Sequence, residues 1–457
     1  MIIYTEIIGY ILICFIILVL IIHKNWKNKN INSGLAVIYI INFLLIHWFA
    51  ALLYLLPWHR YINGKWMFYG LREATYGAGA FAVGNLILAP VLIKLFFLPR
   101  KDKDGAGKTK QDFSSPLPKR YFLLGVASYL ILPHFLAGLP TVTSVIAAGQ
   151  QLMVVGVCLI CWQAWNEGNK RKFKRWLLLT FTFPLFSIVL VGFLAIGISM
   201  VLIVLFFVAR FFKPKWKVVI LGLFVVYIGI SLYLTYMRDR EVLRAAAWGG
   251  APIFTTVKLL GTTITHPSWF NIFDLEQLER IDERMNQNIL AGAAVDYINL
   301  GRIDYAHGRT VMDSFNALIP RALWKEKTML AGSSGDLITS YTGIPFTSDT
   351  SVGMGQVMEF YINFGRMGVI FGFLVLGIFI AIIDIMSGYH LGEGNLKKFI
   401  LWFLPGLAFV NVGGAFAELT STIGAAIFLV YLITSRNLLI ALFALLILFL
   451  LMQVMKG

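Results

Sequence analysis

The residues most suited to chemistry gather in one segment of about 120 residues, Met237 to Gly355, which lies between two groups of hydrophobic stretches. Extended to Arg366, this segment holds 12 of the 39 Lys and Arg residues of the chain, and nine of the 12 are Arg. Arg presents a planar set of five N–H donors that binds phosphate or carboxylate at two points, whereas Lys is a hydrated point charge. The segment therefore predicts anion recognition at a membrane face.

Two pairs of arginines stand at helical spacing in this segment. Arg240 and Arg244 share one face of a helix that we expect to continue from the preceding hydrophobic stretch. Arg280 and Arg284 lie one turn apart on an amphipathic helix predicted over 273–291. Glu276 can pair with Arg280 at i,i+4, which leaves a structural ion-pair face as the alternative; Arg284 has no such acid and is the stronger candidate.

Further along, two short motifs carry a possible base and a possible sugar-stacking ring. His307 is a candidate general base at neutral pH, or a hydrogen-bonded surface residue, and Arg309 follows it. Arg321 comes directly after Pro320, which fixes the backbone there. The ring of Trp324 suits either a sugar face or anchoring at the membrane interface.

The end of the segment combines a polar loop with an acid close to the membrane. Residues 331–355 are rich in Gly, Ser and Thr and lack a Walker motif, so they either wrap a polar ligand or form a flexible connection. Glu359 and Asn363 lie one turn apart before the next hydrophobic stretch. A carboxylate at that depth is costly unless it is paired or functional, and Arg366 is its expected structural partner.

The elements that position these residues are predicted to be membrane-spanning helices. The chain is 58% hydrophobic and 14% charged, with a mean hydropathy of +0.77, whereas soluble domains are about 45–50% apolar and about 25% charged. No cleavable signal peptide is evident. Since a span needs about 20 apolar residues, twelve are predicted: 6–23, 35–57, 75–98, 121–138, 142–165, 176–193, 194–212, 218–236, 367–387, 399–417, 419–434 and 437–455.

The distribution of basic residues predicts the orientation of these spans. Alternate loops carry 22 Lys and Arg residues and should face the cytoplasm, which places both termini and the 237–366 segment outside. The net charge of +16 is explained by this bias and requires no nucleic acid. The chain thus divides into an N-terminal bundle, 1–236, with a cytosolic linker at 99–120, an extracytoplasmic helical loop, 237–366, and a C-terminal bundle, 367–457.

The cysteines do not indicate a metal or disulfide site. Cys14, Cys158 and Cys161 all lie in apolar runs. Cys158 and Cys161 form a CxxC without a second pair, so no metal and no cofactor are expected.

Two motifs of the segment resemble the oligosaccharide repeat-unit polymerases, the O-antigen and exopolysaccharide polymerase family. The layout of spans around one dominant loop is similar as well. The resemblance covers about 130 residues, and its motifs are Ile319-Pro320-Arg321-Ala322-Leu323-Trp324 with Lys327, then Glu359-x-Tyr361-x-Asn363-Phe364-Gly365-x-x-Gly368.

This resemblance implies an all-helical, GT-C-like glycosyltransferase of the bacterial inner membrane. It would join glycan repeat units carried on undecaprenyl pyrophosphate at the periplasmic face, without a metal, among membrane lipids, with a flippase and a chain-length regulator as partners. Many members carry an Arg after a Gly at the outer entry of a mid-chain span, whereas Val191 to Gly197 contains no Arg. That charge must then come from the long segment, or the substrate differs.

In the reaction that the resemblance implies, arginines stabilise the departing lipid pyrophosphate and a base activates the acceptor hydroxyl. The residues expected in catalysis are Glu359, Arg321 and Arg284, with Asp336, Asp349 and His307 as other possible bases. The expected substrate-binding residues are Arg240, Arg244, Arg280, Arg309, His307, Trp324, Tyr361 and Asn363.

Other classes of protein remain open. A ligase that transfers finished polymer would share the fold and the arginines. A transporter of lipid-linked glycans would place charges at mid-depth, where this chain has few: His47, His134 and Asp384. A noncatalytic subunit of an export complex is the third alternative.

Overall fold

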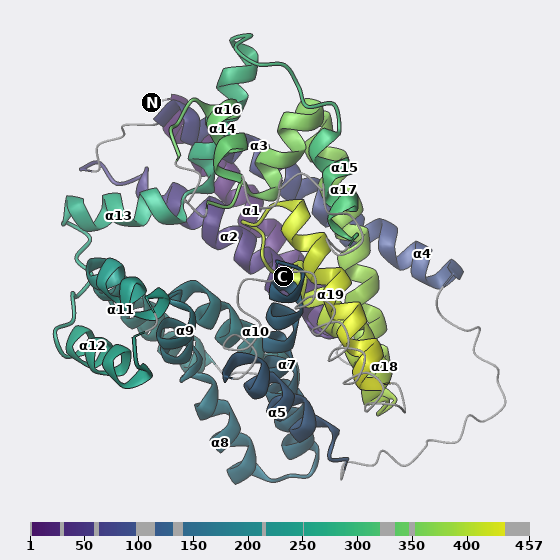
Figure 1. Ribbon diagram of the computed structural model, residues 1–457. Coiled ribbons are helices and arrows are strands. Elements are labelled where there is room, and N and C mark those ends of the chain that lie inside the picture. The colour runs from purple at the N-terminus through teal and green to yellow at the C-terminus, as the bar shows by residue number, and fades with distance from the viewer. Residues whose placement is uncertain are drawn as a thin grey trace, which may run out of the picture.

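The computed structural model describes residues 2–27, 32–58, 64–96, 115–130, 140–212, 216–249, 251–319, 334–346 and 352–434. Every regular element in these ranges is a helix (Figure 1). Eight of the described helical stretches are long and apolar enough to cross a bilayer, so the chain is a multi-pass membrane protein. They are Thr5–Lys27, Leu35–Leu53, Gly64–Phe96, Ser144–Asn166, Lys170–Val191, Leu194–Phe212, Gln356–Gly392 and Phe416–Thr434.

The N-terminal helices contain a local change of helical register. They are α1 (Ile2–Lys27), α2 (Leu35–Leu53), α3 (Gly64–Val83), the π-helix η1 (Gly84–Leu88) and α4 (Ala89–Phe96). In η1 the N–H of Ala89 donates to the carbonyl of Gly84, five residues back. The next donor would be Pro90, which has no N–H. The carbonyl of Asn85 is thereby released and accepts a hydrogen bond of 2.6 Å from Lys24 Nζ.

The predicted break between two closely spaced spans is confirmed. The helices of this region are α5 (Leu117–Leu130), α7 (Pro140–Asn166), α8 (Lys170–Thr180), α9 (Phe183–Val191) and α10 (Leu194–Phe212). The chain turns between α9 and α10 at Gly192, whose φ of 77° lies in the left-handed region that glycine adopts readily.

The segment after α10 differs from its prediction at one point. Helix α11 (Trp216–Trp248) continues past the apolar stretch, as expected, and is followed by α12 (Ile253–Thr265). The single helix predicted over 273–291 is wrong: α13 (Leu275–Met285) and α14 (Gln287–Asn299) meet at Asn286. The Asn286 side chain donates to Asp282 Oδ1 and accepts from the N–H of Asn288, and these local bonds replace the helical pattern. Then come α15 (Arg309–Ala317) and α16 (Ser334–Thr342).

The C-terminal helices have boundaries that differ from those predicted. Helix α17 (Gln356–Gly392) is interrupted at Phe364 and Gly365, where the backbone leaves helical geometry. Helix α18 (Leu396–Ala408) ends earlier than predicted, and the chain turns before α19 (Phe416–Thr434). The predicted span 437–455 lies outside the described residues.

Close approach of small residues fixes α14 against the membrane bundle. A Cβ added at Gly292 of α14 would overlap the Trp66 carbonyl of α3, and one added at Gly70 of α3 would overlap the backbone of Asn288. Helices α3 and α17 also pack together (Figure 1). The element that precedes the candidate site is therefore held directly against spanning helices.

Two of the loops predicted to share one side of the membrane contact helix ends that were predicted to lie on the same side. Ser33 donates to the Asp384 carboxylate through its N–H and its hydroxyl, both at 2.7 Å. Gln163 Nε2 donates to the Ser115 carbonyl at 3.1 Å. The first contact joins the residues before α2 to α17, and the second joins the residues before α5 to the end of α7.

Candidate functional site

An open pocket lies at the N-terminal end of α15, between α15, α16 and the loop before α15. Its volume of ≈ 480 Å³ falls within the range of about 300–1,000 Å³ that is typical of ligand sites. Its lining is mainly apolar and includes a cation, two carboxylic acids and two tyrosines. The lining residues are Ile303, Tyr305, Ala306, Arg309, Thr310, Asp313, Asp336, Leu337, Ser340 and Tyr341.

A sharp turn sets the direction of α15 at this pocket. His307 has a φ of 48°, in the left-handed region that side chains other than glycine seldom adopt, and Gly308 follows with a φ of 86°. The N–H of Ala306 donates to the Ile362 carbonyl of α17 at 2.8 Å, and Gly308 lies against the ring of Phe364. The turn that starts α15 thus packs against α17 at the point where that helix is interrupted.

Asp313 is the most distinctive group in the pocket. Its Oδ2 atom is buried and has no hydrogen-bond partner among the described residues. Burial raises the pKa of this carboxyl, and the charge of Arg309, one turn earlier, opposes that effect. Arg309 is exposed and forms no ion pair among the described residues. A proton acceptor and a free guanidinium therefore line one pocket.

The carboxylate of Glu359 does not line this pocket. It is 1% exposed and accepts a hydrogen bond of 2.7 Å from the N–H of Phe416, so it caps the start of α19. Its expected partner is also wrong: Arg366 binds both oxygens of Glu73, with Nη2 to Oε1 at 2.7 Å. Tyr361, 6% exposed, is likewise covered.

Asn363 links the buried part of α17 to the pocket wall. Its Nδ2 donates to Thr310 Oγ1 at 2.6 Å and to the Glu359 carbonyl at 2.7 Å, and its buried Oδ1 accepts no hydrogen bond from the described part of the chain. Thr310 lines the pocket. Asn363 therefore holds Thr310 of the pocket wall without lining the pocket itself, and Glu359 lies one turn earlier on α17. His307 is exposed and lies beside the pocket, with its ring 6.4 Å from that of Tyr305.

A second group of predicted residues comes together at the C-terminal part of α11. We call Arg240, Arg244 and Arg284 the arginine cluster. The pKa of Arg240 is lowered, first by burial and then by the charges of Arg244 and Arg284. Neither Arg240 nor Arg284 forms an ion pair with a described residue. Such an excess of positive charge favours the binding of an anion.

Arg244 occupies the place where the sequence lacked a charge. Its Nε donates to the Gly192 carbonyl at 3.2 Å, and its guanidinium lies 4.3 Å from the centre of the Phe193 ring and 5.3 Å from that of Trp248. Arg244 of α11 therefore places a guanidinium beside Gly192 and Phe193, in a stretch that contains no Arg of its own. Trp248 in turn donates to the Val191 carbonyl at 3.0 Å.

Other predicted residues do not join either group. Arg280 pairs with Glu276 at 2.6 Å, so the structural alternative is confirmed for this arginine. Arg321, Trp324 and Asp349 lie outside the described residues.

Sequence reasoning missed Asp313, Tyr305 and Tyr341 as pocket residues. For Asp313 a signal was present, because it follows Arg309 at i,i+4 and the two share a helix face. No local signal marks Tyr341, which reaches the pocket only because α16 packs beside α14.

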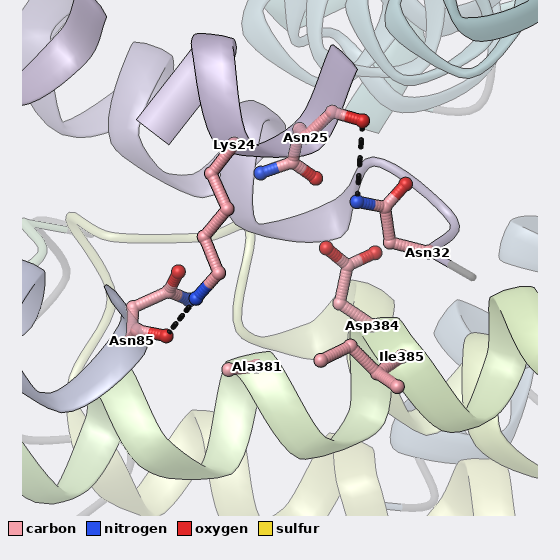
Figure 2. Close-up of a pocket in the computed structure, with 7 residues that line it drawn as sticks. All are labelled: Lys24, Asn25, Asn32, Asn85, Ala381, Asp384 and Ile385. Atoms are coloured by element: carbon pink, nitrogen blue, oxygen red, sulfur yellow. Dashed lines mark hydrogen bonds between the residues drawn. The ribbon is translucent and has the colours of Figure 1, made fainter. Parts of the chain in front are cut away.

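A much smaller cavity lies at the far end of α17, lined by Lys24, Asn25, Asn32, Asn85 and Asp384, with Ala381 and Ile385. Figure 2 shows Lys24 reaching the Asn85 carbonyl and Asn32 donating to that of Asn25. Its volume of ≈ 30 Å³ suits about one water molecule. This cavity is too small for a glycan or a pyrophosphate.

Comparisons of the chain with family models, with curated proteins and with solved structures found no match.

Proposed function

We propose that the chain is a polysaccharide polymerase of the bacterial inner membrane. It joins oligosaccharide repeat units carried on undecaprenyl pyrophosphate, at the periplasmic face, on a GT-C-like scaffold of about 12 spans. The observation that carries this proposal is the pocket at α15, which is lined by both Arg309, without an ion-pair partner among the described residues, and Asp313, whose Oδ2 atom accepts no hydrogen bond from them. A flippase that supplies substrate and a regulator of chain length are the partners that this role requires.

The chemistry at this pocket needs a base and a cation. Asp313 takes the proton of the acceptor hydroxyl, whose oxygen then forms a bond to the anomeric carbon of the growing chain. The bond from that carbon to the lipid pyrophosphate breaks, and Arg309 stabilises the charge that develops on the leaving group. The pocket makes Asp313 a better candidate base than Glu359, because the carboxylate of Glu359 is buried and already bonded to Phe416.

The reaction has two lipid-linked substrates, so it requires a second site for pyrophosphate. The arginine cluster fits this need because it holds three cations, none of which forms an ion pair with a described residue. Arg284 lies near the end of α13, which Asn286 separates from α14, and Tyr305 and Arg309 of the pocket come after α14 in the chain. Helix α14 has 13 residues, and at 1.5 Å per residue it is roughly 20 Å long. Along the chain, α14 therefore lies between the two groups of cationic residues.

The test is chain growth in nanodiscs with a lipid-pyrophosphate-linked repeat unit from the host. Wild type should give a ladder of products on a gel. Arg309→Ala should reduce the rate by about 10²–10³, and Asp313→Asn should remove the ladder. Lys258→Ala, a loss of positive charge on exposed α12, is the matched control and should leave the ladder intact. Normal growth in both pocket variants would exclude this pocket, and no growth with a competent substrate would exclude the polymerase.

A further inference from the structure

Helix α12 has three faces of different character. Thr256, Leu260 and Thr263 are buried against α9 and α11. A second face is apolar and uncovered, because residues at steps of three, four and seven share a side of the helix; its members are Ile253, Phe254, Val257 and Ile264, with Phe254 79% exposed. Lys258, Thr262 and Thr265 form the third face. Packed, apolar and polar sides in one helix are the pattern of a helix at a membrane surface.

The chain after α12 is not helical, yet its backbone groups are bonded to side chains of α11. The N–H of Ser268 donates to Thr235 Oγ1 at 2.8 Å, and the N–H of Phe270 donates to Ser231 Oγ at 3.0 Å. The Tyr227 hydroxyl donates to the Phe270 carbonyl at 3.4 Å. Three α11 residues spaced four apart thus form a row of side chains that hydrogen-bond to the backbone of the non-helical chain beside them.

Further side chains complete this pattern up to the start of α13. Gln277 accepts from the N–H of Asn271 at 2.9 Å and donates to the Trp269 carbonyl at 3.3 Å. Trp58 Nε1 donates to the Ile272 carbonyl at 3.0 Å. In water such groups would bond to solvent, whereas non-helical backbone at membrane depth must find its partners within the protein.

The side chains of the same stretch are large, apolar and uncovered. Trp269 is 58% exposed and Phe273 is 69% exposed. The Trp269 ring stacks on that of Tyr227, with centroids 6.4 Å apart and planes 7° apart. Tyr227 lies in the uncharged part of α11, between the exposed side chains of Phe224 and Leu232. The exposed apolar surface therefore continues from the predicted span in α11 onto the extended stretch.

We propose that α12 and residues 266–274 form a hairpin inserted into the bilayer, with lipid acyl chains as its occupant. Figure 1 places α12 beside α11 at one edge of the molecule, with α13 following it. Arg238 fastens the hairpin by donating to the His266 carbonyl at 2.8 Å and to Ser268 Oγ at 3.0 Å. Part of the 237–366 segment then lies in the membrane. This inference does not depend on the proposed function.

The test uses nitroxide labels on single cysteines in nanodiscs, after replacement of the three buried native cysteines by Ala. Labels at Phe254 and Trp269 should collide with oxygen and be shielded from a water-soluble nickel complex, as should a label at Phe224 of α11. A label at Thr262, on the polar face of α12, should be accessible to the nickel complex. Equal nickel access at Phe254, Trp269 and Thr262 would overturn the proposal. Shielding of Phe254 and Trp269 from both reagents would also overturn it, in favour of a covering protein.

A second measurement avoids cysteine substitution. Brominated lipids quench tryptophans that touch acyl chains, so Trp269→Phe should reduce the quenchable part of the fluorescence. Trp48→Phe is the control, because Trp48 is 4% exposed and its removal should leave that part unchanged. Equal quenchable fluorescence in Trp269→Phe and wild type would refute the insertion.

Discussion

The packing of α14 on α3 leads to a prediction with an internal control. Gly292 lies where α14 meets α3, and an added Cβ there would overlap the Trp66 carbonyl, a backbone atom that cannot rotate away. Gly261 of α12 is also helical but has no atom within 4 Å of its virtual Cβ. In a helix, Ala is more stable than Gly by roughly 0.5–1 kcal/mol, whereas overpacking costs roughly 1–3 kcal/mol. Gly261→Ala should therefore stabilise the protein, and Gly292→Ala should destabilise it.

The assay is the midpoint of thermal unfolding in detergent, which is determined from the loss of monodisperse protein on size-exclusion chromatography after heating. Gly261→Ala should unfold at or above the wild-type temperature, and Gly292→Ala clearly below it. Equal midpoints for the two variants would refute the close contact of α14 with α3. Because α14 lies between Arg284 and the α15 pocket in the chain, that result would also remove the support for this placement of α14.

Three further predictions concern charged groups. Asp313→Asn should abolish chain growth yet leave the unfolding midpoint at neutral pH unchanged or raised, because burial raises the pKa of this carboxyl and disfavours its charged form in the folded state. For the same reason, acidification should reduce wild-type activity at a pH above the ordinary Asp pKa of about 3.9, and a pH–rate profile measures this. Arg244→Ala should weaken binding of a lipid-pyrophosphate glycan by about 10–100-fold and Arg280→Ala by less than about fivefold, and equal effects in thermophoresis would contradict this. Glu73→Gln should lower the unfolding midpoint, because breaking a buried ion pair costs about 3–5 kcal/mol, and the 43% exposure of Arg366 places the loss near the lower limit; an unchanged midpoint would refute it.

The spanning helices were predictable because the bilayer requires about 20 apolar residues in succession. The break at Gly192 and the continuation of α11 followed from a helix-ending glycine and from an unbroken helical pattern. The division between α13 and α14 was not predicted, since the apolar periodicity runs across Asn286. It depends on bonds of one side chain to its neighbours, which periodicity does not report.

The candidate site was predictable only in part, because its pairs join distant parts of the chain. Sequence proximity made Arg366 the expected partner of Glu359, but the interruption at Gly365 lies between them, and Arg366 meets Glu73 of α3 instead. The arginine cluster was foreseen by residue type, whereas the docking of Arg244 at Gly192 requires the fold. These tertiary contacts leave no trace in local spacing.

The measurement that tests the proposed polymerase most directly is the stoichiometry of the reaction in nanodiscs. Purified protein would receive the lipid-linked repeat unit, and both the number of new glycosidic bonds and the amount of free undecaprenyl pyrophosphate would be followed by mass spectrometry. We predict one lipid pyrophosphate released for each bond formed, with both quantities lost together in Arg309→Ala. Movement of intact substrate across the membrane without bond formation, or bond formation unaffected in Arg309→Ala, would contradict this account.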